Sequence, residues 1–262
     1  MKLLKSIIWL IILLTLSCQS SNEKAKKNEQ KELLIYCGIT MIKPMTEIKE
    51  ILENQENCKI VITKGGSGNL LKSIIHNKKG DLYLPGSDAY YTKIGKESPG
   101  IILDTVFVGY NKAAIMVQKG NPKNISNNLN NLMESKYSVV IGNPESGSIG
   151  KETKKILDRK GIFKEVEENA IKLTTDSKDL VRVLEENEAD IVINWYATST
   201  WEENLSFIDV LPIDEKFAQK KKLVLGLLNT SKYPEIAKKF MSFASSKQGR
   251  EIFRKYGLLD VK

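Results

Sequence analysis

The sequence has few of the residues on which most catalytic and metal sites depend. It contains one histidine, His76, and three cysteines, Cys18, Cys37 and Cys58, among 262 residues. A single histidine excludes a site with two histidine ligands, and the cysteines do not have the spacing of zinc ligands. The chain also lacks a G-x-S-x-G nucleophile motif and a recognisable acid–base pair. We therefore expect no metal, no other cofactor and no enzymatic activity.

Long apolar runs are absent too, apart from one at the start of the chain. Residues 1–17 read MKLLKSIIWLIILLTLS, in which Lys2 and Lys5 precede a short apolar run. This run is too short to cross a hydrocarbon core of ~30 Å as a helix. Its order of charged, apolar and small residues is that of a secretory signal peptide. The sequence therefore predicts export to the periplasm or the cell surface.

Cys18 follows a small residue, Ser17, at the predicted cleavage point. This arrangement resembles the bacterial lipobox, and the resemblance implies that Cys18 carries lipid and is the only attachment to a membrane. Two or three acyl chains, at about 0.8 kcal/mol per buried methylene, tether a protein stably where one does not. An ordinary signal peptide cut nearby is the alternative. Residues 18–31 have no large apolar side chain, so we expect a flexible tether after the lipidated cysteine.

The charge of the chain is moderately basic. It has 40 Lys and Arg against 32 Asp and Glu, a net charge of +8, and loss of Lys2 and Lys5 with the signal peptide lowers this to +6. The lysines are mixed with glutamates and form no basic stripe with aromatic residues, which argues against nucleic acid as a partner. A positive field would still attract small anions.

The remainder of the chain alternates short β-branched runs with segments of helical periodicity, which is typical of an α/β fold with parallel sheets. The expected strands are 33–37, 59–63, 81–84, 138–141, 190–194, 207–211 and 223–228. The expected helices begin at Pro44 and near Leu70 and continue with 89–95, 151–159, 178–186, 233–243 and 248–256. Cys37 and Cys58 fall at opposite ends of adjacent parallel strands, too far apart for a disulfide, so we expect two unpaired thiols.

Residues 101–117 read as extended almost throughout, which is longer than a usual strand of about five or six residues. We expect a bend there, where the chain crosses into a second lobe. The predicted division is residues 32–110 plus 223–262 for the first lobe and residues 111–222 for the second.

Two loops rich in Gly and Ser follow predicted strands and precede predicted helices, Gly65–Asn69 in one lobe and Asn143–Gly150 in the other. Exposed backbone N–H groups and the helix dipole attract anions at such places. Ser67 and Ser148 add hydroxyl donors, and Gly68 and its neighbours allow close backbone approach. The alternative is that both loops are tight turns with capping residues. Neither loop has the spacing of a nucleotide-binding motif.

Four segments, in their order along the chain, resemble the molybdate-binding proteins of ABC importers, within the type II periplasmic solute-binding superfamily. They are GGSGNLLKSI, VIGNPESGSIGKETKKIL, EADIVINWYATS and EIAKKFMSFASSKQGREIFRKYGL, and the likeness covers nearly all of residues 33–260. The resemblance implies two lobes joined by crossing strands near Phe107–Tyr110 and Phe207–Leu211. It further implies a cleft in which hydroxyls and backbone amides hold an oxyanion.

The resemblance also assigns individual binding positions. The first-loop position falls on Gly38, with Cys37 and Thr40 as neighbours, and the second on Ser67. The remaining positions fall on Ser148 or Ile149, near Leu180, and on Trp195 or Tyr196.

Together these features lead us to expect a monomeric, lipid-anchored receptor that closes on a small oxyanion and delivers it to an ABC permease. The ligand alternatives are molybdate, tungstate, sulfate, phosphate and a small organic phosphate or carboxylate. The alternative function is an adhesion or host-interaction lipoprotein that keeps the solute-binding fold without transport.

Overall fold

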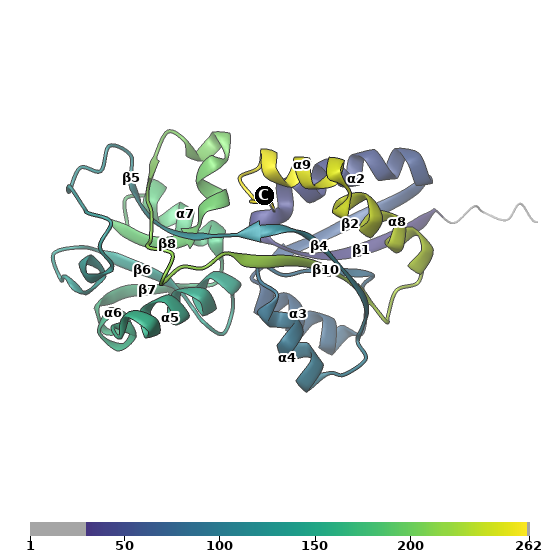
Figure 1. Ribbon diagram of the computed structural model, residues 1–262, viewed down its shortest axis with the longest axis horizontal. Coiled ribbons are helices and arrows are strands. Elements are labelled where there is room, and N and C mark those ends of the chain that lie inside the picture. Colours follow the sequence, from purple (N-terminus) through teal and green to yellow (C-terminus); the bar gives the residue numbers. More distant parts are fainter. Residues whose placement is uncertain (1–29, 261–262) are drawn as a thin grey trace, which may run out of the picture. The chain divides into compact units, whose positions relative to one another are not determined.

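The computed structural model describes residues 30–260, whose strands form two sheets of five strands each (Figure 1). The first sheet contains, in spatial order, β2 (Cys58–Gly65), β1 (Lys31–Gly38), β3 (Leu82–Leu84), β10 (Lys221–Leu228) and β4 (Ile102–Asn111). The second contains β7 (Ala170–Thr174), β6 (Val139–Gly142), β8 (Ile191–Trp195), β5 (Ala113–Gln118) and β9 (Ile208–Leu211). The α/β class and the two separate sheets confirm the predicted fold class.

Both sheets have the same pairing pattern. Strands β2, β1 and β3 are parallel, and β10 and β4 continue the first sheet with antiparallel pairings. Strands β7, β6 and β8 are likewise parallel, and β5 and β9 continue the second sheet with antiparallel pairings. The sheets are therefore mixed, not purely parallel as the sequence predicted, because the strands that pass between the sheets enter each one without a helical crossover.

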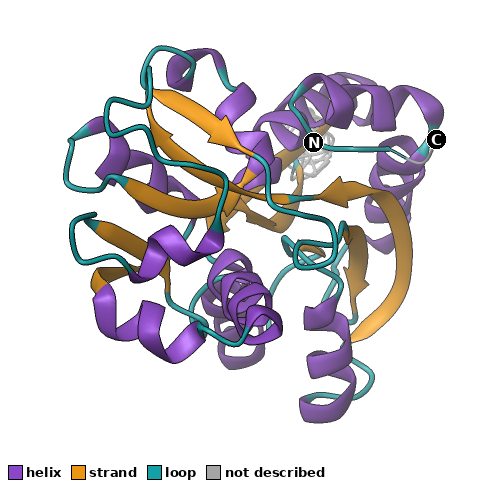
Figure 2. Ribbon diagram, turned by 60° about the vertical axis from the view of Figure 1, so that its left-hand side comes forward, coloured by secondary structure: helices purple, strands orange, loops and turns teal. Residues whose placement is uncertain are grey.

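Helices flank the strands of both sheets (Figure 2). In the first half they are α2 (Ile42–Glu56), α3 (Ser67–Asn77), α4 (Ala89–Glu97), α8 (Pro234–Ser245) and α9 (Lys247–Lys255). In the second they are α5 (Ser148–Lys160), α6 (Phe163–Asn169) and α7 (Ser177–Glu185). Short 3-10 turns are η1 (Ile39–Met41), η2 (Leu129–Met133), η3 (Tyr196–Thr200) and η4 (Glu202–Asn204). Helices α2, α8 and α9 pack together on one side of the first sheet, and α3 and α4 lie on the other (Figure 1).

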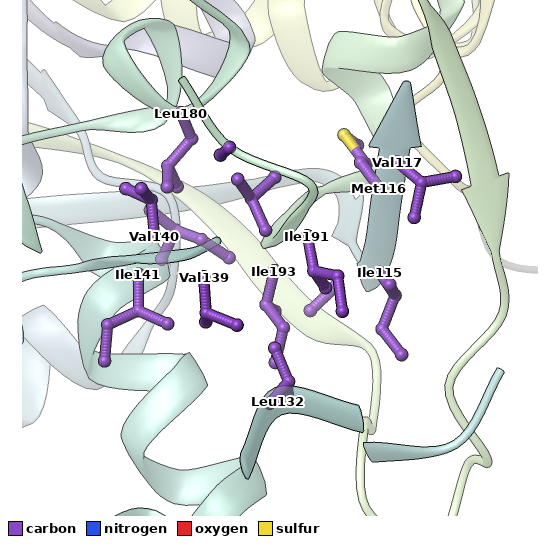
Figure 3. Close-up of a cluster of buried hydrophobic side chains, with 14 of the residues drawn as sticks. Ile115, Met116, Val117, Leu132, Val139, Val140, Ile141, Leu180, Ile191 and Ile193 are labelled. Atoms are coloured by element: carbon purple, nitrogen blue, oxygen red, sulfur yellow. The ribbon is translucent and has the colours of Figure 1, made fainter. Parts of the chain in front are cut away.

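Each sheet has its own apolar core. The core of the second sheet combines β-branched residues of the strands with Leu180 of α7 (Figure 3). Leu180, Val183 and Leu184 recur at helical spacing on the buried face of this helix. The first sheet packs its strands against Met45, Ile48 and other apolar residues of α2, α8 and α9. A further apolar cluster packs Leu71 and Ile74 of α3 and Ile94 of α4 against the first sheet. The separate sheets and their cores favour two mechanically distinct halves.

The chain passes directly from the first sheet to the second at Lys112, which separates β4 from β5. The predicted bend within residues 101–117 lies there. The chain returns through residues 212–220, between β9 and β10. The exact lobe boundaries stay a prediction.

Some local expectations differ from the structure. Helix α2 begins at Ile42, so Pro44 lies in its first turn and not at its first position. Proline is equally compatible with this place, because N–H groups of the first turn have no acceptor within the helix. Helix α6 and strand β7 were not expected. Strand β7 is an edge strand whose Ile171 and Leu173 are exposed, so its sequence lacks the buried signature of a central strand.

Cys37 and Cys58 are both buried free thiols, as predicted. The parallel register pairs Cys58 with Lys31 and Cys37 with Lys64, which puts the two cysteines at opposite ends of their strands. Within residues 30–260, no helix is long and apolar enough to cross a bilayer. The predicted signal peptide, Cys18 and most of the tether lie outside the described residues.

Candidate functional site

A small cavity lies where loops of the two sheets meet, with a volume of about 10 Å³. Elements of the first sheet contribute Gly38, Ile39, Thr40, Gly65, Gly66, Ser67 and Gly86 to its lining. Elements of the second contribute Gly147, Ser148, Ile149, Asp176, Ser177 and Trp195. A cavity needs roughly 10–15 Å³ of such space to hold one water molecule, so the two sheets lie in a tightly closed arrangement.

Three helices begin at this cavity, each with a serine. Ser67, Ser148 and Ser177 are the first residues of α3, α5 and α7, and all three line the cavity. The N-cap residues of α3 and α5 are glycines, which have no side chain that could cap the helix. The positive ends of three helix dipoles therefore converge on one point, which favours a negative charge there.

The hydroxyls of Ser67 and Ser148 are arranged as donors toward the cavity. The Ser67 Oγ accepts a hydrogen bond of 3.0 Å from the backbone N–H of Gly86. The Ser148 Oγ accepts one of 3.2 Å from the indole Nε1 of Trp195. Because each oxygen already accepts a bond from the protein, each O–H is left to donate to a bound acceptor.

Thr40 differs from these serines. Its Oγ1 donates to the Met41 sulfur at 2.8 Å and accepts from the Asn111 Nδ2 at 3.1 Å. The hydroxyl proton of Thr40 is thus engaged within the protein. Asn111 is 1 % exposed, and its Oδ1 has no hydrogen-bond partner within the described part of the chain.

Asp176 is the only ionisable residue among the described residues that line the cavity. It is the N-cap of α7, where its Oδ1 accepts from the backbone N–H groups of Lys178 at 2.8 Å and Asp179 at 3.3 Å. Burial raises the pKa of Asp176 above its usual value, and these backbone hydrogen bonds offset the effect only in part. A carboxyl group with a raised pKa therefore borders the converging donors.

The two halves touch closely around the cavity. The carbonyl oxygen of Ser146 accepts from the backbone N–H groups of Gly68 at 3.0 Å and Asn69 at 3.2 Å. A Cβ atom on Gly66 would lie 2.6 Å from the same carbonyl oxygen and 2.7 Å from that of Thr175. Only glycine fits at position 66 in this arrangement.

Six of the ten residues expected from the sequence line the cavity: Gly38, Thr40, Ser67, Ser148, Ile149 and Trp195. Both members of the alternative at Ser148 or Ile149 are there. At the alternative between Trp195 and Tyr196, Trp195 lines the cavity, although its indole N–H is directed to Ser148 and not into open space.

The structure places the other four away from the lining. Cys37 is fully buried in the apolar core of the first sheet. Leu180 lies in the core of the second sheet, about one turn beyond the start of α7 (Figure 3). Tyr196 begins η3 and is partly exposed, because β8 ends at Trp195 and the next side chain points elsewhere. Gly68 lies behind the cavity, against Glu145 and Ser146.

Sequence reasoning missed Ile39, Gly86, Asp176 and Ser177. Asp176 directly precedes the apolar periodicity of α7, so its N-cap signature could have located the start of this helix and, with it, the two lining residues. Gly86 lies in the turn after β3, at the same sheet edge as the predicted loops.

Lysines from both halves flank a groove beside the cavity. Lys93 of α4 and Lys151 of α5 line this groove together with Gly68 and Tyr90. The ammonium of Lys151 lies 5.0 Å from the centre of the Tyr90 ring. Burial, and then repulsion by Lys93 and Lys155, lowers the pKa of Lys151. Lys72 lines this groove too, and so do Glu97 and Glu145, so the charges beside the cavity are mixed, with three lysines and two glutamates. His76 is exposed, and residues 30–260 hold no group of three or more His, Cys, Asp and Glu side chains suited to a metal ion.

Comparison with known proteins gives one family match that spans most of the chain. The family described as bacterial extracellular solute-binding protein matches residues 33–259. A Haemophilus influenzae protein whose name describes it as a binding protein is 28% identical over 233 residues, covering 88% of this chain and 92% of that protein.

Solved structures share the fold at low sequence identity. PEB3, known from Campylobacter jejuni and solved with L-phospholactate bound, has a TM-score of 0.69 and 19% identity, covering 87% of this chain and 100% of that one. The periplasmic molybdate-binding protein of Azotobacter vinelandii has a TM-score of 0.73 and 12% identity, covering 88% of this chain and 100% of that one.

Proposed function

This chain belongs to the bacterial extracellular solute-binding proteins, and from that membership we propose that it captures a small oxyanion in the cavity between its two sheets. The observation that supports the proposal is the convergence of α3, α5 and α7, each beginning with a serine, on one enclosed point. Neutral hydroxyls and amides can hold an anion without a bound cation, because the helix dipoles supply the favourable field.

Individual residues have distinct roles in this proposal. The hydroxyls of Ser67 and Ser148 donate to the anion. The backbone N–H groups of Ile149 and Ser177, at the starts of α5 and α7, complete the set of donors. Gly38 and Gly86 let the backbone approach the ligand, and Trp195 fixes the orientation of the Ser148 hydroxyl.

The ligand class follows from the chemistry of the lining, with support from two proteins of the same fold. The solved relatives include a molybdate-binding protein and a protein with bound L-phospholactate, and both ligands are anions. Molybdate, tungstate, sulfate, phosphate and small organic phosphates or carboxylates are therefore the ligands to test.

We further propose delivery of the anion to an ABC permease by a lipoprotein anchored through Cys18. Closure of the halves would move the donors together and remove water from the anion. An adhesion or host-interaction role requires no enclosed set of inward-facing donors, so the cavity favours the receptor over this alternative.

Thermal unfolding of residues 30–262 against these anions tests the proposal. A ligand that binds only the folded state raises the unfolding midpoint. At a hundredfold excess over Kd, it stabilises the folded state by about 2.7 kcal/mol. We expect at least one anion to raise the midpoint.

Ser67→Ala should weaken binding of that anion about tenfold or more, since it removes one donor of the set. Ser73→Ala is the matched control, because Ser73 lies on the same helix and its hydroxyl donates to the Asn69 carbonyl oxygen, away from the cavity. Equal anion affinity of the two variants in calorimetry would argue against the assigned site.

A further inference from the structure

The cavity contains a group that an anion receptor would not need. Asp176 lines the same space as Ser67, Ser148 and the starts of three helices, and its carboxyl group caps the third of these helices. An ionised carboxylate repels an anion, so its place among these donors requires a reason.

Only part of Asp176 is committed to the fold. Its Oδ1 accepts from two backbone N–H groups at the start of α7. These bonds fix the carboxyl group at the edge of the cavity and leave its second oxygen to accept a further hydrogen bond.

The charged groups around Asp176 do not neutralise it. On its own segment, Lys178 and Asp179 follow it, and Asp179 turns its carboxylate back to the Thr175 hydroxyl at 2.8 Å. Among the elements packed against α7, β7 carries Lys172 and η3 carries Tyr196, while η1, β5, β6 and β8 carry no charged residue. Lys172 pairs with Glu188 at 3.1 Å. Within the described part of the lining, no lysine or arginine offsets the carboxylate.

We propose that Asp176 selects an anion that carries a proton, such as hydrogenphosphate, over fully deprotonated tetrahedral dianions such as sulfate and molybdate. The inference rests on the proposed anion-binding function and names the ligand class of the same site. The ligand's O–H donates to the free oxygen of Asp176, while Ser67, Ser148 and the helix amides donate to the ligand's other oxygens. The arrangement holds one proton between Asp176 and the anion.

A dianion without a proton binds only when Asp176 itself takes one up. The raised pKa of Asp176 makes this uptake easier at mildly acid pH. Sulfate affinity then falls about tenfold for each pH unit above the pKa of Asp176, because binding is linked to one proton. Hydrogenphosphate brings its own proton, so its affinity changes little over the same range once the ligand's own ionisation between dihydrogenphosphate and hydrogenphosphate is corrected for.

The test measures sulfate and phosphate affinity by calorimetry between about pH 5.5 and about pH 8, with wild-type residues 30–262 and Asp176→Asn. Asparagine is an equally good N-cap, so the variant keeps the start of α7. In the wild type we expect phosphate to bind at least tenfold more tightly than sulfate at the upper end of the range. In Asp176→Asn we expect sulfate affinity to rise and to lose its pH dependence.

Asp158→Asn is the matched control, because it removes one negative charge from an exposed site on α5 that pairs with Lys154. It should behave like the wild type. Sulfate that binds the wild type as tightly as phosphate, without pH dependence, would overturn the role of Asp176 and leave the anion receptor standing. Failure of every anion to bind the wild type at any pH would overturn the proposed function itself, and the inference with it.

Discussion

Individual side chains at the cavity show how a short polar residue acquires one direction of hydrogen bonding. The hydroxyl oxygens of Ser67 and Ser148 accept hydrogen bonds from Gly86 and Trp195, so their O–H groups remain free to donate. The Thr40 hydroxyl instead donates to the Met41 sulfur. All three are hydroxyl residues in cavity-lining loops. Their different chemistry comes from their partners, which lie up to 71 residues away in the sequence.

The two thiols of the described chain illustrate the opposite case, in which burial removes reactivity. Burial is the main reason that the pKa values of both Cys37 and Cys58 are raised, and Glu53 and Glu56 raise that of Cys58 further. The thiolate is the reactive form. We expect neither thiol of residues 30–262 to react with a thiol-specific dye at neutral pH until the protein unfolds, and both to react in denaturant. Rapid labelling of the native protein would contradict this prediction.

In each sheet, a buried aspartate just before the central strand accepts a hydrogen bond from the backbone at or near a neighbouring strand. Asp81 precedes β3 and Asp190 precedes β8, and both are buried. Asp81 accepts from the backbone N–H of Leu34 in β1 at 2.7 Å. Asp190 accepts from the backbone N–H of Ser138, just before β6, at 2.8 Å. Each carboxylate therefore fixes the start of the central strand of its sheet.

Asp81 makes two further bonds, from the Ser231 hydroxyl at 2.7 Å and the Lys232 N–H at 3.0 Å. Asp81→Asn places an amide where only acceptors fit, so we expect the free energy of unfolding to fall by about 2 kcal/mol or more. Asp104→Asn is the control, because this exposed carboxylate accepts only from its neighbour Thr105 among the bonds we observe. Urea unfolding gives both values; equal stability of the two variants would show that the Asp81 bonds contribute little.

The molecule as a whole depends on the close approach of its two sheets. Gly86 follows β3 of the first sheet, and a Cβ atom there would clash with the Ser148 hydroxyl and come within 3.4 Å of the Trp195 Nε1. Gly66 meets backbone oxygens of the second half in the same way. Glycines at these two positions allow the closed arrangement.

Gly86→Ala should hold the two halves apart without changing either core. We expect a larger radius of gyration in solution scattering and an anion affinity about tenfold weaker, which corresponds to 1.4 kcal/mol. Gly86→Ala combined with Ser148→Gly removes the clashing side chain and should restore the smaller radius, although not the affinity. A single variant as compact as the wild type would contradict this account.

The sequence was informative where the cause of a structure is local. Alternating periodicities located most strands and helices. Ser67 and Ser148 were predicted to lie in loops just before helices, whereas each is the first residue of its helix. Sequence reasoning failed at the exposed edge strand β7 and at Leu180. Two indications competed at Leu180. The apolar face of its helix predicts a core residue, whereas the family resemblance predicts a binding position. The structure shows that Leu180 packs in the core.

Periodicity, turn residues and the Gly/Ser loops are properties of neighbouring residues, so the alternation of elements, and with it the α/β class, could be derived from the chain alone. The meeting of Gly86 with Ser148, and of Asp176 with the starts of α3 and α5, joins positions tens of residues apart and on different sheets. These contacts depend on how the two sheets are held together through β4–β5 and β9–β10, which no local pattern encodes. The serines at the helix starts, and even Asp176 as an N-cap, are therefore accessible to sequence reasoning, whereas their meeting around one cavity depends on the packing of the two sheets.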